Sequence, residues 1–201
     1  MGKLVAVVGR TGVGKTPLTR LLCAAGNFLT GLEGHLERPF QALFKIDPRY
    51  ALANQVDYLL LRAEQETTIR RAARTGIVDG GLEMDFHGFT RLFHARGQLT
   101  GAEFDLCRRL YAYVRGAVPP PDLVIHLDAP AAVIAARLAR RERINIASPG
   151  DIPLLHSFLD EWLAGLDTAR LIRVDASSND PAYRKILPIL LDRIAALERS
   201  E

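Results

Sequence analysis

A glycine-rich loop near the amino end constrains this chain more than any other feature. The segment Gly9-Arg10-Thr11-Gly12-Val13-Gly14-Lys15-Thr16 has the spacing G-x-x-x-x-G-K-[ST]. The apolar run Leu4 to Val8 precedes it and is typical of a buried parallel strand, while leucines at helical spacing follow it. Strand, glycine loop and helix come in the order that a phosphate-binding loop requires.

The residue types of this loop fit phosphate chemistry, and we expect all eight residues from Gly9 to Thr16 to bind a nucleotide. Glycines let successive backbone N–H groups turn toward phosphate oxygens, and the positive end of the following helix faces the same anion. Lys15 is expected to reach the β- and γ-phosphates. The Thr16 hydroxyl is expected to hold Mg²⁺, which binds oxygen ligands and bridges phosphate oxygens in such sites.

Composition is that of an ordinary globular protein with one domain over residues 1–201. Hydrophobic residues make up 48% of the chain and charged residues 24%, and the formal net charge is +3. The slight basic excess suits an anionic ligand such as a nucleotide, but no basic tail argues for nucleic-acid binding. Only Cys23 and Cys107 are present, without metal spacing, which favours a cytoplasmic protein. No apolar run approaches the roughly eighteen residues of a membrane span, so no membrane partner is expected.

Strands and helices alternate along the rest of the chain. Further strands are predicted at Ile77 to Asp79, Leu123 to Leu127 and Leu171 to Val174. Helices are predicted from Tyr50 to Arg71, from a capping box at Thr100 to about Arg115, from Leu154 to Leu166 and from Tyr183 to Leu197. Gly26 to Gly34 is interpreted as a connection, and Leu82 to Arg96 shows a mixed pattern. This alternation predicts an α/β fold with a parallel sheet covered on both faces.

Carboxylates follow two of the predicted strands. Asp79 ends one strand and Asp128 ends another, and the glycine loop follows a third. Open parallel sheets bind ligands beyond the carboxyl ends of their strands. The three features together therefore favour a nucleotide site at this edge.

With these motifs the chain resembles the deoxynucleoside kinases, from the glycine loop to the turn after the last strand. The most specific parts are the segment Pro39 to Arg62 and the arginine cluster Arg137 to Arg143. The resemblance implies a three-layer P-loop NTPase fold with an arginine-bearing lid at about residues 137–152. It implies ATP-dependent phosphoryl transfer to the 5′-hydroxyl of a deoxynucleoside. It also implies a dimer, either of identical chains or with a related subunit.

On the acceptor side, the resemblance gives roles to four residues. Glu33 matches the catalytic base, which takes the proton of the attacking hydroxyl. Gln55 and Arg62 match residues on one helix that read the base, and Asp85 matches a position that contacts it.

On the donor side, Asp79 matches an acidic residue that approaches Mg²⁺. The lid arginines match Arg137, Arg141 and Arg143, whose guanidinium groups would stabilise charge on the transferred phosphoryl group. The turn that begins Asp175-Ala176-Ser177 matches the loop around the adenine of the donor. ATP and Mg²⁺ are therefore the expected cofactors.

Three positions around the acceptor depart from the family pattern. Where the family has an Arg-Ser pair after the acidic residue that ends the strand, this chain has Gly80-Gly81. Where the family has a tyrosine that binds the 3′-hydroxyl of the sugar, this chain has Lys45. The lid acid falls near Asn145 or Ile146, and neither is acidic. Loss of one buried charge-assisted contact costs on the order of 2–4 kcal/mol, so three such losses together could abolish ordinary deoxynucleoside phosphorylation. Compensation by Arg10 or Lys45 is one explanation, and an unusual acceptor is another.

Two other functions remain open on the sequence. The altered acceptor contacts also fit a catalytically degenerate, nucleotide-binding or regulatory subunit. Lys45 would suit a kinase for a nucleoside monophosphate, because an acceptor phosphate needs a cationic pocket. The intact glycine loop, Glu33 and the lid arginines favour the active enzyme.

Overall fold

A parallel sheet forms the centre of the computed structural model, which describes residues 1–31, 38–139, 149–177 and 183–199. The strands of the described residues lie in the order β2-β3-β1-β4-β5, and every neighbouring pair is parallel. They are β1 (Leu4–Gly9), β2 (Leu29–Gly31), β3 (Gly76–Asp79), β4 (Leu123–Asp128) and β5 (Leu171–Asp175). The predicted parallel sheet is confirmed.

Strand β1 is the middle of the sheet, and every one of its residues is buried. Val5 and Val7 pack into the core on one face, whereas Leu4, Ala6 and Val8 pack into the core on the other. A strand buried on both faces needs apolar residues at successive positions. This requirement explains the unbroken apolar run before the glycine loop.

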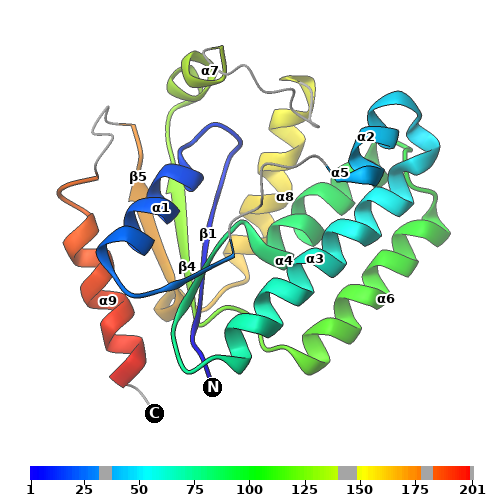
Figure 1. Cartoon of the computed structure of the whole chain (residues 1–201). Coiled ribbons are helices and arrows are strands. Elements are labelled where there is room, and N and C mark those ends of the chain that lie inside the picture. Colours follow the sequence, from blue (N-terminus) through cyan, green and yellow to red (C-terminus); the bar gives the residue numbers. More distant parts are fainter. Residues whose placement is uncertain (32–37, 140–148, 178–182, 200–201) are drawn as a thin grey trace.

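Helices cover both faces of the sheet, which gives the predicted three layers. Helices α1 (Lys15–Ala25) and α9 (Leu187–Arg199) cover one face, and α3 (Ala51–Arg71) and α8 (Ile152–Ala164) cover the other (Figure 1). Leu18 and Ile194 belong to the first core, and Ile69 and Leu159 to the second. No helix of the described residues combines the length and hydropathy needed to cross a bilayer.

Shorter elements and one further long helix complete the described chain. Helix α6 (Gly101–Ala117) packs on α3, and α7 (Ala131–Ala139) stands beyond the carboxyl ends of the strands (Figure 1). The other helical segments are α2 (Pro39–Ile46), η1 (Pro48–Tyr50), α4 (Gly81–Glu83), η2 (Met84–Thr90), α5 (Arg91–Ala95), η3 (Pro149–Asp151) and η4 (Thr168–Arg170).

The capping box predicted at the start of α6 is confirmed. The Thr100 hydroxyl oxygen accepts a hydrogen bond from the Glu103 backbone N–H at 3.3 Å, and the Thr100 N–H donates to Glu103 Oε2 at 2.7 Å. Two of the N–H groups that a helix start leaves unpaired are satisfied in this way.

Two segments differ from the prediction in their type of structure. A connection is predicted for Gly26 to Gly34, whereas Leu29–Gly31 forms the edge strand β2. Three residues are too few to show a period, and their pairing with β3 is a long-range contact. Leu82 to Arg96 is helical, and its central part, η2, is a π-helix. A π-helix has no 3.6-residue pattern to recognise, which explains the mixed appearance.

Candidate active site

The glycine loop joins β1 to α1 in a backbone conformation that depends on glycine. Gly9, Gly12 and Gly14 have φ angles of 143°, 89° and 113°. A Cβ atom at Gly9 would also lie 2.3 Å from the backbone oxygen of Leu127 on β4. Side chains rarely adopt such φ angles, so these positions favour glycine over all other residues. The backbone of the loop is thereby free to surround an anion closely.

Lys15 lies against the loop that precedes it. Its Nζ donates hydrogen bonds to the backbone oxygens of Gly9, at 2.9 Å, and Arg10, at 3.2 Å. The ammonium group is thus held at the loop itself, as the predicted contact with donor phosphates requires.

The Thr16 hydroxyl and the Asp79 carboxylate, which are predicted to hold Mg²⁺, lie next to each other. The Thr16 hydroxyl donates to Asp79 Oδ2 at 2.5 Å, and Asp79 pairs with Val7 in the sheet register. Hydroxyl and carboxylate oxygens are of the kind that Mg²⁺ binds, so these two residues would hold such an ion together with phosphate and water. Among the described residues no group of three or more His, Cys, Asp or Glu side chains is placed so that it could hold a metal ion.

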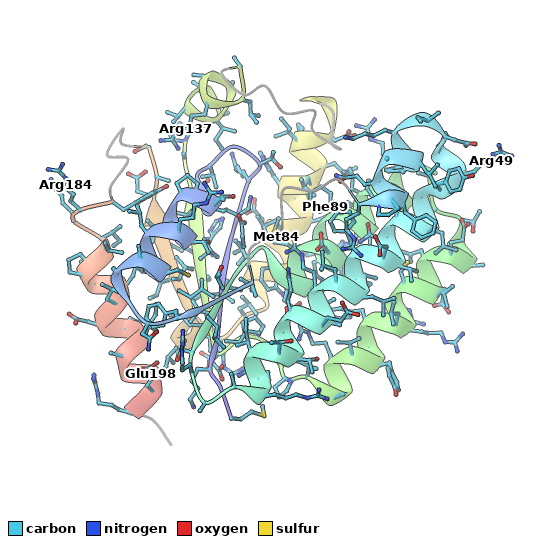
Figure 2. All side chains as sticks on the ribbon, viewed as in Figure 1. Arg49, Met84, Phe89, Arg137, Arg184 and Glu198 are labelled. Carbon is cyan, nitrogen blue, oxygen red and sulfur yellow. The ribbon has the colours of Figure 1, made fainter. Side chains whose placement is uncertain are left out.

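Arg137 connects the predicted lid, the glycine loop and the turn after β5. From α7 its Nη1 donates to the backbone oxygen of Val13 at 2.9 Å, and its Nη2 donates to that of Ala176 at 2.8 Å. Figure 2 shows Arg137 on α7 beyond the carboxyl edge of the sheet. Its predicted partners Arg141 and Arg143 lie outside the described residues, as does the predicted base Glu33.

The turn after β5 lies beside the glycine loop. Asp175 Oδ1 accepts a hydrogen bond from the Ser177 N–H at 2.8 Å, and the Ala176 N–H donates to the backbone oxygen of Asp128 at 2.7 Å. The Ser177 contact lowers the pKa of the Asp175 carboxyl. These contacts fix the turn next to the end of β4.

Tyr183 contacts the glycine loop, a contact that the sequence does not predict. Its hydroxyl lies 3.4 Å from the backbone oxygen of Gly14, and burial raises its pKa. A Cβ at Gly14 would lie 2.4 Å from the Tyr183 hydroxyl, so a larger residue there would displace the tyrosine side chain. Nothing local in the sequence marks this contact, since 169 residues separate the two positions.

Gln55, Arg62 and Asp85, predicted to contact the acceptor base, form one buried cluster. Gln55 Nε2 donates to the backbone oxygen of Asp85 at 3.0 Å, and Arg62 Nε donates to Asp85 Oδ2 at 2.7 Å. Their relative exposures are 1%, 5% and 6%. Gln55 and Arg62 come from α3 and Asp85 from η2, which Met84 and Phe89 mark in Figure 2. Buried charges require such partners.

The two candidate replacements for the missing arginine lie in different places. Arg10 Nε is 3.6 Å from Asp128 Oδ1, on the β4 side of β1, whereas Gly80 follows β3 on the opposite side. Lys45 is exposed on α2. In this structure the charge of Arg10 therefore serves the β4 end and not the position next to Gly80.

Known proteins resemble this chain over most of its length. A family model described as deoxynucleoside kinase matches residues 5–185. A deoxyadenosine/deoxycytidine kinase of Bacillus subtilis (strain 168) is 22% identical over 182 residues, which cover 88% of this chain and 84% of that protein. A deoxyadenosine kinase of Dictyostelium discoideum is 28% identical over 143 residues, covering 71% of this chain and 58% of that protein.

Solved structures share the fold. The structure of deoxyadenosine kinase from M. mycoides with bound dATP has a TM-score of 0.77 at 16% identity and covers 97% of this chain and all of that one. The same enzyme with bound dCTP has a TM-score of 0.74 at 15% identity. At this identity the likeness concerns the arrangement of the sheet and helices.

Proposed function

Because the chain belongs to the deoxynucleoside kinase family and is thus an enzyme that phosphorylates nucleosides, we propose that it transfers the γ-phosphoryl group of MgATP to the 5′-hydroxyl of a deoxynucleoside. The observation that carries this proposal is the short segment Asp79 to Asp85. Asp79, its first residue, accepts a hydrogen bond from Thr16 of the glycine loop. Asp85, its last residue, accepts one from Arg62 of α3 in the buried cluster. One segment therefore joins the donor side of the site to the acceptor side.

The donor side would hold the triphosphate through backbone N–H groups of Gly9 to Thr16 and through Lys15. Thr16 and Asp79 would hold Mg²⁺, which supplies charge neutralisation at the phosphate oxygens. Arg137 would add a fixed cation beside the loop. Fixed cations matter most where charge develops on the transferred group, because they need not reorganise during the reaction.

The chemical step needs a base for the 5′-hydroxyl proton, and we assign this role to Glu33. A carboxylate within hydrogen-bond distance of the hydroxyl takes its proton as the oxygen attacks phosphorus. Arg141 and Arg143 would complete the lid with Arg137. In this proposal the whole chain acts as one kinase unit.

The buried cluster suggests which bases are accepted. Gln55 uses its Nε2 on the Asp85 backbone, so its Oε1 is the atom that would accept a hydrogen bond from the base. Adenine, cytosine and guanine all carry an exocyclic amino donor, whereas thymine does not, so this acceptor favours those three bases. Among them we propose deoxyadenosine or deoxycytidine as the acceptor, because these are the activities named for the Bacillus relative.

We further propose a cytoplasmic dimer that uses α3 and α6. Leu60 on α3 and Leu106 and Tyr113 on α6 are large apolar residues with 45%, 46% and 80% exposure. Neighbouring helices that expose apolar side chains favour a helix-to-helix interface. Free Cys23 and Cys107 suit a reducing compartment.

The test is ATP-dependent product formation with the four natural deoxynucleosides, their ribonucleosides and their monophosphates. We expect turnover with deoxyadenosine or deoxycytidine, and we expect Lys15→Ala to abolish it. Lys3→Ala is the matched control, because it removes the same charge at the opposite end of β1. Turnover on monophosphates alone, or none at all from protein that binds MgATP, would contradict the proposal.

A further inference from the structure

The Gly80-Gly81 pair forms a tight turn that follows Asp79. Gly80 and Gly81 have φ angles of 83° and 71°, a region that side chains rarely adopt. The Gly80 N–H donates to the backbone oxygen of Val7 on β1 at 2.9 Å. The N–H of Leu82, two residues later, donates to Glu66 Oε1 at 2.8 Å. The turn is therefore attached at one side to β1 and at the other to α3.

Glu66 is a fully buried carboxylate, with a relative exposure of 0%. Arg115 of α6 lies beside it, and Arg115 Nη1 donates to Glu66 Oε2 at 2.7 Å. Arg115 Nε also lies 2.8 Å from Glu83 Oε1, one residue after Leu82. Burial alone would lower the pKa of Arg115, but the two carboxylates together raise it. The guanidinium therefore stays charged beside the buried Glu66 side chain.

The glycine at position 81 leaves the space that Glu66 uses. A Cβ atom there would lie 3.1 Å from Glu66 Oε1 and 2.9 Å from Val78 Cγ2. A serine, which the family resemblance leads one to expect here, would press on both atoms and would strain the backbone. The Glu66 carboxylate therefore lies where it would contact a side chain at position 81, and glycine leaves that space open.

We propose that Glu66, with Arg115 as its counterion, is a positioning residue that holds the Gly80-Gly81 turn so that Asp79 stays directed at Thr16. This inference rests on the proposed function, because it concerns the magnesium ion that Thr16 and Asp79 would share. Glu66 acts through the Leu82 N–H and does not touch the nucleotide. Arg115 is engaged by Glu66 and Glu83 and does not restore the charge of the family's arginine at the phosphates.

The variant Glu66→Gln tests this directly. The native carboxylate accepts from Leu82 N–H with one oxygen and from Arg115 with the other, whereas an amide has only one acceptor oxygen. One of the two contacts must therefore be lost without a change in volume. Glu64→Gln is the matched control, because Glu64 is an exposed glutamate on the same helix.

The readout is the affinity for ATP, measured by titration calorimetry with excess Mg²⁺ and again with EDTA, alongside turnover. Mutation of a residue that orients a metal ligand lowers metal affinity by about 10–100-fold. Mg²⁺ should raise the ATP affinity of the parent, and we expect this increase to be at least about tenfold smaller in Glu66→Gln. With EDTA, the variant should bind ATP with the same affinity as the parent. Glu64→Gln should match the parent in both conditions.

Each other result has a defined meaning. A Glu66→Gln protein with the parent's Mg²⁺ dependence overturns the inference, and so does a parent whose ATP affinity does not change with Mg²⁺. A parent that shows this Mg²⁺ effect but phosphorylates no acceptor contradicts the proposed function, while the effect still tests Glu66.

Gly81→Ala provides the test if Glu66→Gln does not fold. Its Cβ would press on Glu66 Oε1, so we expect the same loss of Mg²⁺ tightening. The control is Gly97→Ala, because Gly97 has a similar φ of 68° and no neighbour within 4 Å of the added Cβ. If both alanine variants keep the parent's Mg²⁺ dependence, the anchor is not needed and the inference is overturned.

Discussion

Removal of the Arg62 guanidinium should destabilise the protein strongly. Arg62→Met keeps most of the apolar stem but removes the guanidinium that lies 2.7 Å from the buried Asp85 carboxylate. The two side chains are only 6% and 8% exposed, so water cannot replace the lost contact. Breaking a buried ion pair in this way costs about 3–5 kcal/mol. With an unfolding slope of about 2 kcal/mol per molar urea, the midpoint should fall by about 2 M.

Urea unfolding at pH 7 measures this cost, and an exposed pair gives the control. Arg108 and Asp105 on α6 are 56% and 51% exposed, so Arg108→Met should change the unfolding free energy by less than about 0.5 kcal/mol. The double variant Arg62→Met/Asp85→Leu should recover much of the loss, because it buries no lone charge. A cost below about 1 kcal/mol for Arg62→Met, or a double variant less stable than the single one, would refute the reasoning.

Three further changes have expected outcomes. Gly12→Ala should lower the free energy of unfolding by about 1–3 kcal/mol and weaken ATP binding. The reason is that the φ angle of Gly12 is 89° and the added Cβ would lie 2.9 Å from Leu138 Cδ2. Urea unfolding and an ATP titration that match those of the parent would contradict this. Thr100→Ala should lose about 1 kcal/mol and about 2–4 °C in Tm by calorimetry, since the capping contact is removed. Burial and the nearby Arg10 guanidinium lower the pKa of His156 from 6.5 to about 4, so the unfolded state binds more protons between these values and stability falls as the pH falls through this window. His156→Gln should lose less stability than the parent between pH 7 and pH 5, and an equal loss in urea unfolding would contradict the assignment.

Local sequence signals located the parts of the fold that depend on short stretches of chain. The unbroken apolar run of β1, the three glycines of the loop and the capping box at Thr100 each act within a few residues. The helical spacing of apolar residues predicted α3 and α6 with ends that lie within a few residues of the observed ones. Because strands that alternate with helices form parallel sheets, the order of elements was enough to place the glycine loop and Asp79 at one edge.

Tertiary structure decided the features that join distant parts of the chain. Edge strand β2 exists only through its pairing with β3, and Tyr183 reaches Gly14 across 169 residues. The sequence showed Gly80-Gly81 only as a departure from a family pattern. The structure shows that the missing side chain at Gly81 leaves room for the buried carboxylate of Glu66, which a helix earlier in the chain supplies. No local pattern can reveal such a pairing, because the free energy of a buried charge depends on which partners the folded chain brings within hydrogen-bond distance.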